Sequence, residues 1–282
     1  MKIALSTETT ADLTPELRKE FGVTILPFKV VLKDTTYNDG DITTEEIFKF
    51  VDKTGILPKT TAINQFEYQE YFENLKKDYD AVIHIALSSG LSSSCQNAIL
   101  ASQEVENVFV VDSLALSTGI ALQVIYARKL IDEGLDAKEI YEKLIARREN
   151  AQVSFVVERL DYLHKGGRCS SLALLGANIL KIRPRIVMKD GKLSSDKKYR
   201  GKMEAVVEKY CTDTLAEFSN IDKTIAFITY TTATDEMVNA AVSALKNAGF
   251  ERVEIARAGC TIASHCGANT LGILYFNDGD QA

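Results

Sequence analysis

Short apolar runs rich in β-branched residues alternate with longer amphipathic segments along the first half of the chain. The apolar runs predict strands, and the amphipathic segments, whose apolar positions recur at helical spacing, predict helices. Strands are expected at 2–6, 23–32, 81–87 and 108–111, and helices near 66–77, 95–104 and 117–133. Because this alternation is typical of an α/β fold, we predict a mainly parallel sheet in an N-terminal domain, residues 1–150.

Helix boundaries in this half are well marked. Thr14 precedes Pro15, a pair suited to an N-cap and a first-turn proline, and 43–46 reads as a capping box. Asp136 is expected to cap the helix that follows it.

The pattern changes after residue 150. A polar segment at 149–152 precedes an apolar run, and Asp190-Gly191, between two strand-like segments, is a strong signal for a two-residue hairpin. Helices are expected near 202–218 and 234–248, and strands near 224–230, 253–256 and 272–276. We therefore predict a C-terminal α+β domain, residues 151–282, packed closely on the first because no Pro/Gly-rich linker separates them.

Composition narrows the classes of function. With 46% hydrophobic and 26% charged residues, this is an ordinary globular chain. A formal net charge of −6 gives no general attraction to nucleic acid, so no such partner is expected. The N-terminal apolar run is too short for a signal peptide or membrane span, and we expect a cytoplasmic protein.

The five cysteines show no C-x-x-C pairing and are expected to remain thiols. Cys260 and Cys266 could be combined with His265 as metal ligands, but no carboxylate or second histidine joins them in the sequence. We therefore predict no metal site.

A serine-rich stretch, ALSSGLSSSCQNA at 86–98, joins a predicted buried strand to a predicted helix. One interpretation is a helix cap, since serine hydroxyls satisfy the free amides of a first turn. One serine would suffice for that, whereas five hydroxyls with Gly90 stand where open α/β sheets bind ligands. A ligand site is the favoured interpretation.

The chemistry of this loop favours a carboxylate over a phosphate. It offers hydroxyls, amides and a helix N-terminus, but neither the lysine of a P-loop nor the spacing of a dinucleotide-binding loop. A G-x-S-x-G nucleophile elbow does not occur, and no base for Ser92 or Ser93 is evident in the sequence.

Two more segments carry candidate chemistry. Thr60-Thr61 precedes a predicted helix and, taken alone, is best interpreted as an N-cap. Around two glycines at 166–167, Lys165 and Arg168 come close together, although an ordinary charged loop would look the same.

Two histidines occupy contrasting positions. His84 lies inside the apolar run VIHIAL, and we interpret it as a core histidine. His265 lies in a glycine-bracketed run of small residues, where little apolar packing explains it. His265 is therefore the stronger candidate for a functional role.

Taken together, these segments resemble the DegV family of bacterial fatty-acid-binding proteins, in order and across nearly the whole chain. The family motifs T-D-S-T-x-D-L, K-T-S-Q-P and S-S-G-L-S-G-T correspond to TETTADL, PKTTAIN and SSGLSSS. The motifs K-G-G-R-I-S, K-I-K-P-I with a D-G hairpin, and A-H-x-G-x-G correspond to HKGGRCS, KIRPRIVMKDGKL and SHCGANTLG. Each motif alone is weak, but six in the same order are specific.

The resemblance implies two domains that enclose one long-chain fatty acid at and near their junction, with no resident cofactor. It implies a lipid carrier rather than an enzyme: members present the lipid to a separate ATP-binding subunit of fatty acid kinase, which makes the acyl phosphate. Transient contact with a membrane is compatible with that role.

Matched by motif, the residues that would bind the carboxylate are hydroxyl side chains and one histidine: Thr60, Thr61, Ser92, Ser93 and His265. Arg168 and Arg200 would lie near the carboxylate or on the surface that meets the kinase. Four of the motifs depart from the family pattern: Glu8 replaces Asp, Ala62-Ile63 replaces Gln-Pro, Ser93 replaces Gly, and Ala268-Asn269 replaces the usual small or proline-glycine pair. Ser93 matters most, since its side chain either adds a hydroxyl contact or narrows the approach to the carboxylate.

Two alternatives stay open. A self-contained hydrolase would use Ser92 or Ser93 as nucleophile and His265 as base, and a regulatory protein would retain only a vestigial pocket. A kinase acting alone is not expected, because the sequence has no nucleotide-binding loop.

Overall fold

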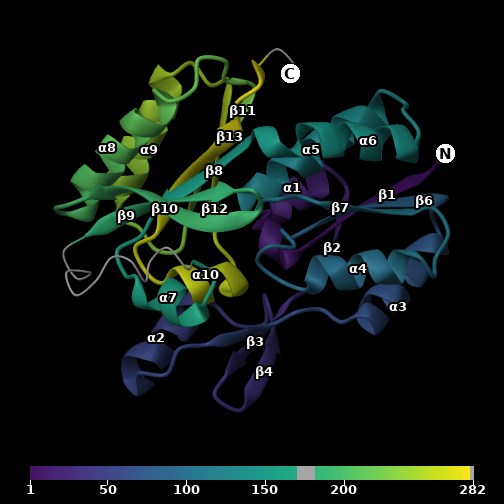
Figure 1. Cartoon of the computed structure of the whole chain (residues 1–282), viewed down its shortest axis with the longest axis horizontal. Helices are drawn as coiled ribbons and strands as arrows, with labels where there is room; N and C mark the ends of the chain where they lie inside the picture. Colours follow the sequence, from purple (N-terminus) through teal and green to yellow (C-terminus); the bar gives the residue numbers. More distant parts are fainter. Residues whose placement is uncertain (170–181, 280–282) are drawn as a thin grey trace.

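The computed structural model describes residues 1–169 and 182–279, arranged as layers of helices and sheets (Figure 1). Two of the family motifs extend into 170–181, through Ser170 of HKGGRCS and Lys181 of KIRPRIV, and these parts lie outside the described residues.

The N-terminal half contains a four-stranded sheet. Its strands are, in spatial order, β2 (Val23–Leu26), β1 (Ile3–Glu8), β6 (Ala81–Ala86) and β7 (Val108–Asp112). All three pairings are parallel, as predicted. β1 and β6 are buried along their whole length because helices cover both faces of the sheet.

The covering helices lie in two pairs (Figure 1). On one face are α3 (Gln65–Lys76) and α4 (Ser94–Ser102), and on the other are α5 (Thr118–Asp132) and α6 (Ala137–Arg147). α5 also packs on the sheet of the C-terminal half, so it lies between the two sheets.

The C-terminal half contains a six-stranded mixed sheet. Its spatial order is β10 (Lys192–Tyr199), β9 (Arg183–Lys189), β8 (Ala151–Val156), β13 (Leu271–Phe276), β11 (Ile225–Tyr230) and β12 (Arg252–Arg257). Only the β11–β12 pair is parallel. α8 (Met203–Leu215) and α9 (Asp235–Asn247) cover the face away from α5, which confirms the α+β prediction.

The predicted hairpin at Asp190-Gly191 is confirmed between β9 and β10. Both residues have positive φ, 50° and 73°, as the tight turns that suit a twisted hairpin require.

A third, three-stranded antiparallel sheet was not expected. It consists of β4 (Thr35–Asn38), β3 (Lys29–Leu32) and β5 (Lys59–Thr61). The apolar run 23–32 is therefore not one strand, because it divides at Pro27 and Phe28 into β2 and β3, which belong to different sheets. The amide of Phe28 donates to Thr9 Oγ1 instead of to a strand (3.0 Å).

Placing Thr60-Thr61 as the N-cap of the next helix was wrong. Both residues lie in β5, and Asn64 caps α3 through a complete capping box. The other predicted caps, Thr14, Thr43 and Asp136, are confirmed. The remaining short elements are η1 (Thr9–Ala11), α1 (Pro15–Glu20), α2 (Thr44–Thr54), η2 (Arg148–Asn150), α7 (Asp161–Gly166) and α10 (Cys260–Cys266).

One apolar core runs from α3 and α4 through the parallel sheet and α5 to the inner face of the six-stranded sheet. β8 begins at Ala151, where the second domain was predicted to start, but this core crosses that point, and a division at 150/151 stays a prediction. His84 is a core histidine, fully buried with Nδ1 2.8 Å from Ser6 Oγ. No helix among residues 1–169 and 182–279 is long and apolar enough to span a membrane.

Candidate functional site

The serine loop between β6 and α4 uses three of its hydroxyls to hold the fold. Ser88 Oγ donates to the carbonyl of Gly191 in the β9–β10 turn (2.6 Å), and Ser89 Oγ donates to Asp112 (2.6 Å). Ser94 Oγ lies 2.7 Å from the Tyr68 hydroxyl. These serines anchor the loop to both halves of the molecule.

Ser92 and Ser93 are left to face a cavity. Ser92 Oγ accepts a hydrogen bond from the Ser94 amide (3.2 Å), so it also caps the start of α4. The hydroxyl hydrogen of Ser92 remains free to donate to a ligand. Ser93 occupies the N-cap position without a side-chain cap bond and is exposed.

The cavity has a volume of about 270 Å³ and lies between the serine loop, β5, α10 and the segment after α7. Its polar side chains are Thr60, Ser92, Ser93, Arg168, Thr261 and His265. Its apolar lining comes from Phe28, Ala62, Leu87, Leu91, Leu116, Leu163, Leu193, Ile262 and Cys266. Five of the seven residues proposed from sequence therefore meet around one space.

The other two residues lie elsewhere. Thr61 follows Thr60 in β5, is exposed, and does not line this cavity. This follows from strand geometry, since successive side chains point to opposite faces. Arg200 is exposed just after β10 and is also absent from the lining.

Thr60 and His265 form the polar centre of the cavity. Thr60 Oγ1 lies 2.8 Å from His265 Nε2. Burial, with a smaller contribution from the positive charge of Arg168, lowers the pKa of His265 to about 4, so the imidazole is neutral near pH 7. If an anion accepts the Thr60 hydroxyl hydrogen, the Thr60 oxygen must accept from Nε2–H, which fixes the histidine tautomer.

Gly166 keeps the imidazole in this position. A Cβ at Gly166 would lie 2.8 Å from His265 Nδ1, closer than non-bonded atoms approach. Of the glycine pair at 166–167, Gly166 therefore has a packing role beside the site.

Two buried aspartates, which sequence reasoning missed, hold α10 in place. The Asp12 carboxyl group accepts from the Gly259 amide (2.8 Å), and Asp39 accepts from the amides of Cys260 and Thr261 (2.8 and 2.9 Å). They therefore satisfy the free N–H groups at the start of the helix that carries His265. Burial raises the pKa of Asp12 to about 8.

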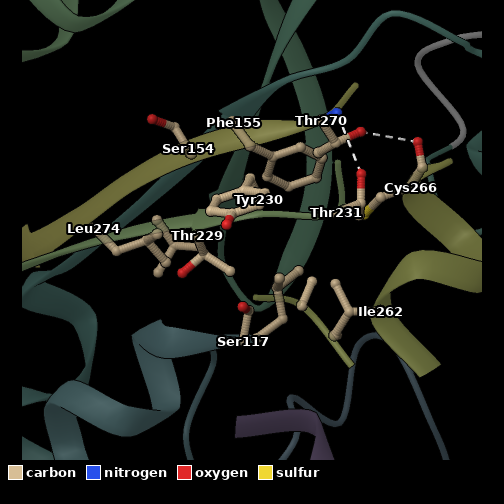
Figure 2. Close-up of a pocket in the computed structure, with 14 residues that line it drawn as sticks. Ser117, Ser154, Phe155, Thr229, Tyr230, Thr231, Ile262, Cys266, Thr270 and Leu274 are labelled. Carbon is tan, nitrogen blue, oxygen red and sulfur yellow. Dashed lines mark hydrogen bonds between the residues drawn. The ribbon is translucent and has the colours of Figure 1, made fainter. Parts of the chain in front are cut away.

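A second, inner cavity lies next to this one, and Leu116, Ile262 and Cys266 line both. The inner cavity lies between the start of α5 and the inner face of the six-stranded sheet, with Phe155 and Leu274 on its wall (Figure 2). Its volume is about 20 Å³, room for little more than one water molecule.

Three threonine hydroxyls around the inner cavity are already paired. Thr229 Oγ1 lies 2.6 Å from Thr118 Oγ1, and Thr231 Oγ1 donates to the Gly267 carbonyl (2.6 Å). Thr270 Oγ1 donates to the Cys266 carbonyl (3.1 Å; Figure 2). Apolar groups can therefore bind here without leaving these threonine hydroxyls unpaired.

The arrangement gives little support to a hydrolase. The hydrogen bond of His265 goes to Thr60, and none joins His265 to Ser92 or Ser93 within the described residues. The five cysteines are buried, and no disulfide forms within the described residues. No group of three or more potential metal ligands occurs in the described part of the chain.

Comparison with known proteins identifies the family. A family model described as DegV matches residues 2–278. The chain belongs to the DegV family. A DegV domain-containing protein of Caldanaerobacter subterraneus is 30% identical over 284 residues, which cover 97% of this chain and 98% of the relative. A protein of Thermotoga maritima named fatty acid-binding protein is 34% identical over 224 residues, covering 76% of this chain and 78% of that protein.

Solved DegV structures have the same fold. A structure from Thermus thermophilus, described as fatty acid binding of a DegV family protein, superposes with a TM-score of 0.91 at 28% identity and covers 98% and 100% of the two chains. DegV from Bacillus subtilis, described as a fatty acid binding protein, gives a TM-score of 0.85 at 25% identity, covering 99% and 100%.

Proposed function

We propose that this DegV protein binds one long-chain fatty acid, with its carboxylate between Thr60 and Ser92 and its acyl chain directed towards the inner cavity. The observation that carries the proposal is that the cavity around the Thr60–His265 centre adjoins the apolar inner cavity between two sheets, with Leu116 and Ile262 in the lining of both. DegV relatives described as fatty acid-binding proteins support the same ligand class.

The energetics fit this ligand. Each buried methylene contributes about 0.8 kcal/mol, so a chain of ~14 methylenes has a gross ~11 kcal/mol before the costs of association. The inner cavity is narrow, and side chains around it must move apart to admit a long tail. The ordering and repacking of those side chains are among the costs of association.

The head-group end fits a carboxylate that is bound but not neutralised. Hydrogen bonds to a charged group contribute about 1.5–3 kcal/mol each, so a few donors offset much of its desolvation. The Arg168 guanidinium is engaged with protein carbonyls, through Nε to Leu91 (3.3 Å) and Nη1 to Gly166 (2.8 Å). A carboxylate held mainly by neutral hydroxyls keeps its nucleophilicity.

This property leads to the second part of the proposal: the protein is a carrier that presents the carboxylate to a separate ATP-binding kinase subunit, which forms the acyl phosphate. The openness of the head-group end, where Thr60 is half-buried and Ser93 exposed, supports access by a partner.

The first test is mass spectrometry of small molecules extracted from the natively purified protein. We expect one fatty acid per chain. If no lipid copurifies and added fatty acid does not bind, the pocket is vestigial and the proposal fails. Turnover of an ester by the protein alone would instead support the hydrolase.

The second test addresses the carrier role. The lipid-loaded protein is mixed with ATP and a purified ATP-binding kinase subunit, and acyl phosphate is trapped as a hydroxamate. Product is expected only when both proteins are present. Equal rates with free fatty acid and without this protein would contradict the carrier role.

A further inference from the structure

We call the cavity that contains Thr60, Ser92 and His265 the carboxylate-binding cavity. A third cavity lies beside it and shares Thr60, Arg168 and His265 with it. Its volume is about 340 Å³, and it lies between the segment that leads into β5, α7 and the end of α10. We call it the outer cavity. It adds Lys59 and Lys165 to the shared residues.

The outer cavity is locally cationic in an acidic protein. The formal net charge of the chain is −6, yet Lys59, Lys165 and Arg168 line this space and none of the described lining residues is acidic. None of these three cations forms an ion pair with another described residue. The nearest acidic side chain of α7, Asp161, is paired with Arg159 (2.8 Å).

A singly charged carboxylate does not need this much positive charge. The proposed function already supplies donors for it, from Thr60 and Ser92, in the neighbouring cavity. When a carboxylate oxygen attacks the γ-phosphorus of ATP, an O–P bond forms and the bond to ADP breaks. The head group then carries a phosphate with up to two negative charges, displaced outward from the acyl carbon.

We propose that the outer cavity is a phosphate subsite, in which Lys59 and Lys165 bind the phosphoryl group of the acyl phosphate. This inference rests on the proposed carrier function. The shared wall of Thr60 and His265 places such a group next to the carbonyl end of the lipid. Lysine ammonium groups bind phosphate as compact charges on flexible stems, which suits a group that arrives and leaves.

The test compares two ligands with the same chain, hexadecanoic acid and hexadecyl phosphate, by displacement of a fluorescent fatty acid from the intact protein. The variant Lys59→Gln/Lys165→Gln is expected to lose roughly 3- to 10-fold in affinity for hexadecyl phosphate, as for partly exposed charge pairs. Its affinity for hexadecanoic acid is expected to stay within 2-fold. The control, Lys143→Gln/Lys246→Gln, removes two exposed lysines of α6 and α9 and should change neither affinity.

Salt and pH provide independent readouts. The wild-type preference for hexadecyl phosphate should shrink from 0.05 M to 0.5 M NaCl, because added salt screens exposed charges. It should grow as pH rises through about 6, where a phosphate monoester acquires its second charge. Both trends should be weaker in the double lysine variant.

The outcomes separate this inference from the proposed function. Equal losses for both ligands would overturn the subsite, since the lysines would then serve the carboxylate. Unchanged binding of hexadecyl phosphate would overturn it while leaving fatty acid binding intact. Failure of the wild type to bind hexadecanoic acid would overturn both proposals.

Discussion

The proposed lipid site has an inner end, at the inner cavity, and an outer end, around Thr60 and Ser92 in the carboxylate-binding cavity. The two ends use polar groups in opposite ways. At the inner end, Thr229, Thr231 and Thr270 are bonded to other protein groups, which leaves an apolar wall. At the outer end, Ser92 retains a hydroxyl hydrogen that can be donated to a ligand, and so does Thr60 when His265 Nε2 carries the proton of their hydrogen bond. The same residue types thus close one end to water and prepare the other for an anion.

α10 connects the two ends. Ile262 and Cys266 line both the carboxylate-binding cavity and the inner cavity, while His265 faces Thr60. Because Asp12 and Asp39 bind the start of this helix, its position depends on residues more than 200 positions earlier in the chain. In the proposed lipid site, one short helix, bonded at its start to two aspartates of the N-terminal half, would therefore contribute to binding both the head group and the tail.

Removing the hydroxyls of Thr60 and Ser92 at the outer end should have the strongest effect on binding. Thr60→Ala/Ser92→Ala is expected to weaken fatty acid binding at least about 100-fold, since each hydrogen bond to a charged group contributes about 1.5–3 kcal/mol. Equilibrium titration with a fluorescent fatty acid measures the loss, and thermal unfolding checks that the variant is folded.

Thr61→Ala is the matched control, one residue along the same strand but on its exposed side. Its affinity should stay within 3-fold of the wild type. Retention of wild-type affinity by the double variant would disprove the assignment of the carboxylate site.

Narrowing the inner end should affect long chains selectively. Ile262→Phe places a larger side chain where the carboxylate and inner cavities meet. If two methylenes are excluded, binding of an 18-carbon acid weakens about 15-fold, at about 0.8 kcal/mol per methylene. A 12-carbon acid should lose less than 3-fold. Ile262→Leu, which conserves volume, is the control, and unchanged binding of both acids by Ile262→Phe would show that the tail does not pass this point.

The anchoring of α10 predicts a dependence of stability on pH. The pKa of Asp12 is raised from its usual 3.8 to about 8 by burial, so the folded state binds more protons than the unfolded state between these values. The free energy of unfolding should therefore fall as pH rises. His265, whose pKa is lowered from 6.5 to about 4, acts in the opposite direction below pH 6.5.

The window from pH 7 to 8 best separates the effect of Asp12, because His265 is then largely neutral in both states. Over this range the free energy of unfolding of the wild type should fall by roughly 1 kcal/mol, from about 1.4 kcal/mol per pH unit and proton. Asp12→Asn keeps an acceptor for the Gly259 amide. Its free energy of unfolding, measured in denaturant titrations, should change less with pH than that of the wild type. Parallel curves for the two proteins would show that another group is responsible.

Much of the fold could be predicted because its signals are local. The parallel strands, the Asp190-Gly191 hairpin and the caps at Thr14 and Thr43 each depend on a few adjacent residues. The serine loop was also recognisable from its excess of hydroxyls. The sequence does not show which of these serines face the cavity, because Ser88 and Ser94 form hydrogen bonds with Gly191 and Tyr68, which are distant in sequence.

The least predictable parts join distant segments. Thr60 reaches His265 only because β5 belongs to a separate three-stranded sheet that packs against α10, and a three-residue strand leaves little periodicity to detect. Asp39 caps α10 across 221 residues, whereas capping rules consider only adjacent positions. The family resemblance supplied Thr60, which the residue pattern alone assigned to a helix cap, and it gave a ligand-binding role to His265, which the pattern had identified only as a functional candidate.

The smallest effect is expected at Ser93, where the family motif has glycine. Ser93 is exposed at the N-cap of α4 and makes no side-chain cap bond, and exchange of serine for glycine at an N-cap costs only a few tenths of a kcal/mol. Ser93→Gly should therefore change fatty acid affinity less than 2-fold and leave chain-length preference unaltered. A loss above 10-fold in the same titration would mean that Ser93 donates to the carboxylate. The outer end would then bind the carboxylate through three hydroxyls, those of Thr60, Ser92 and Ser93, rather than two.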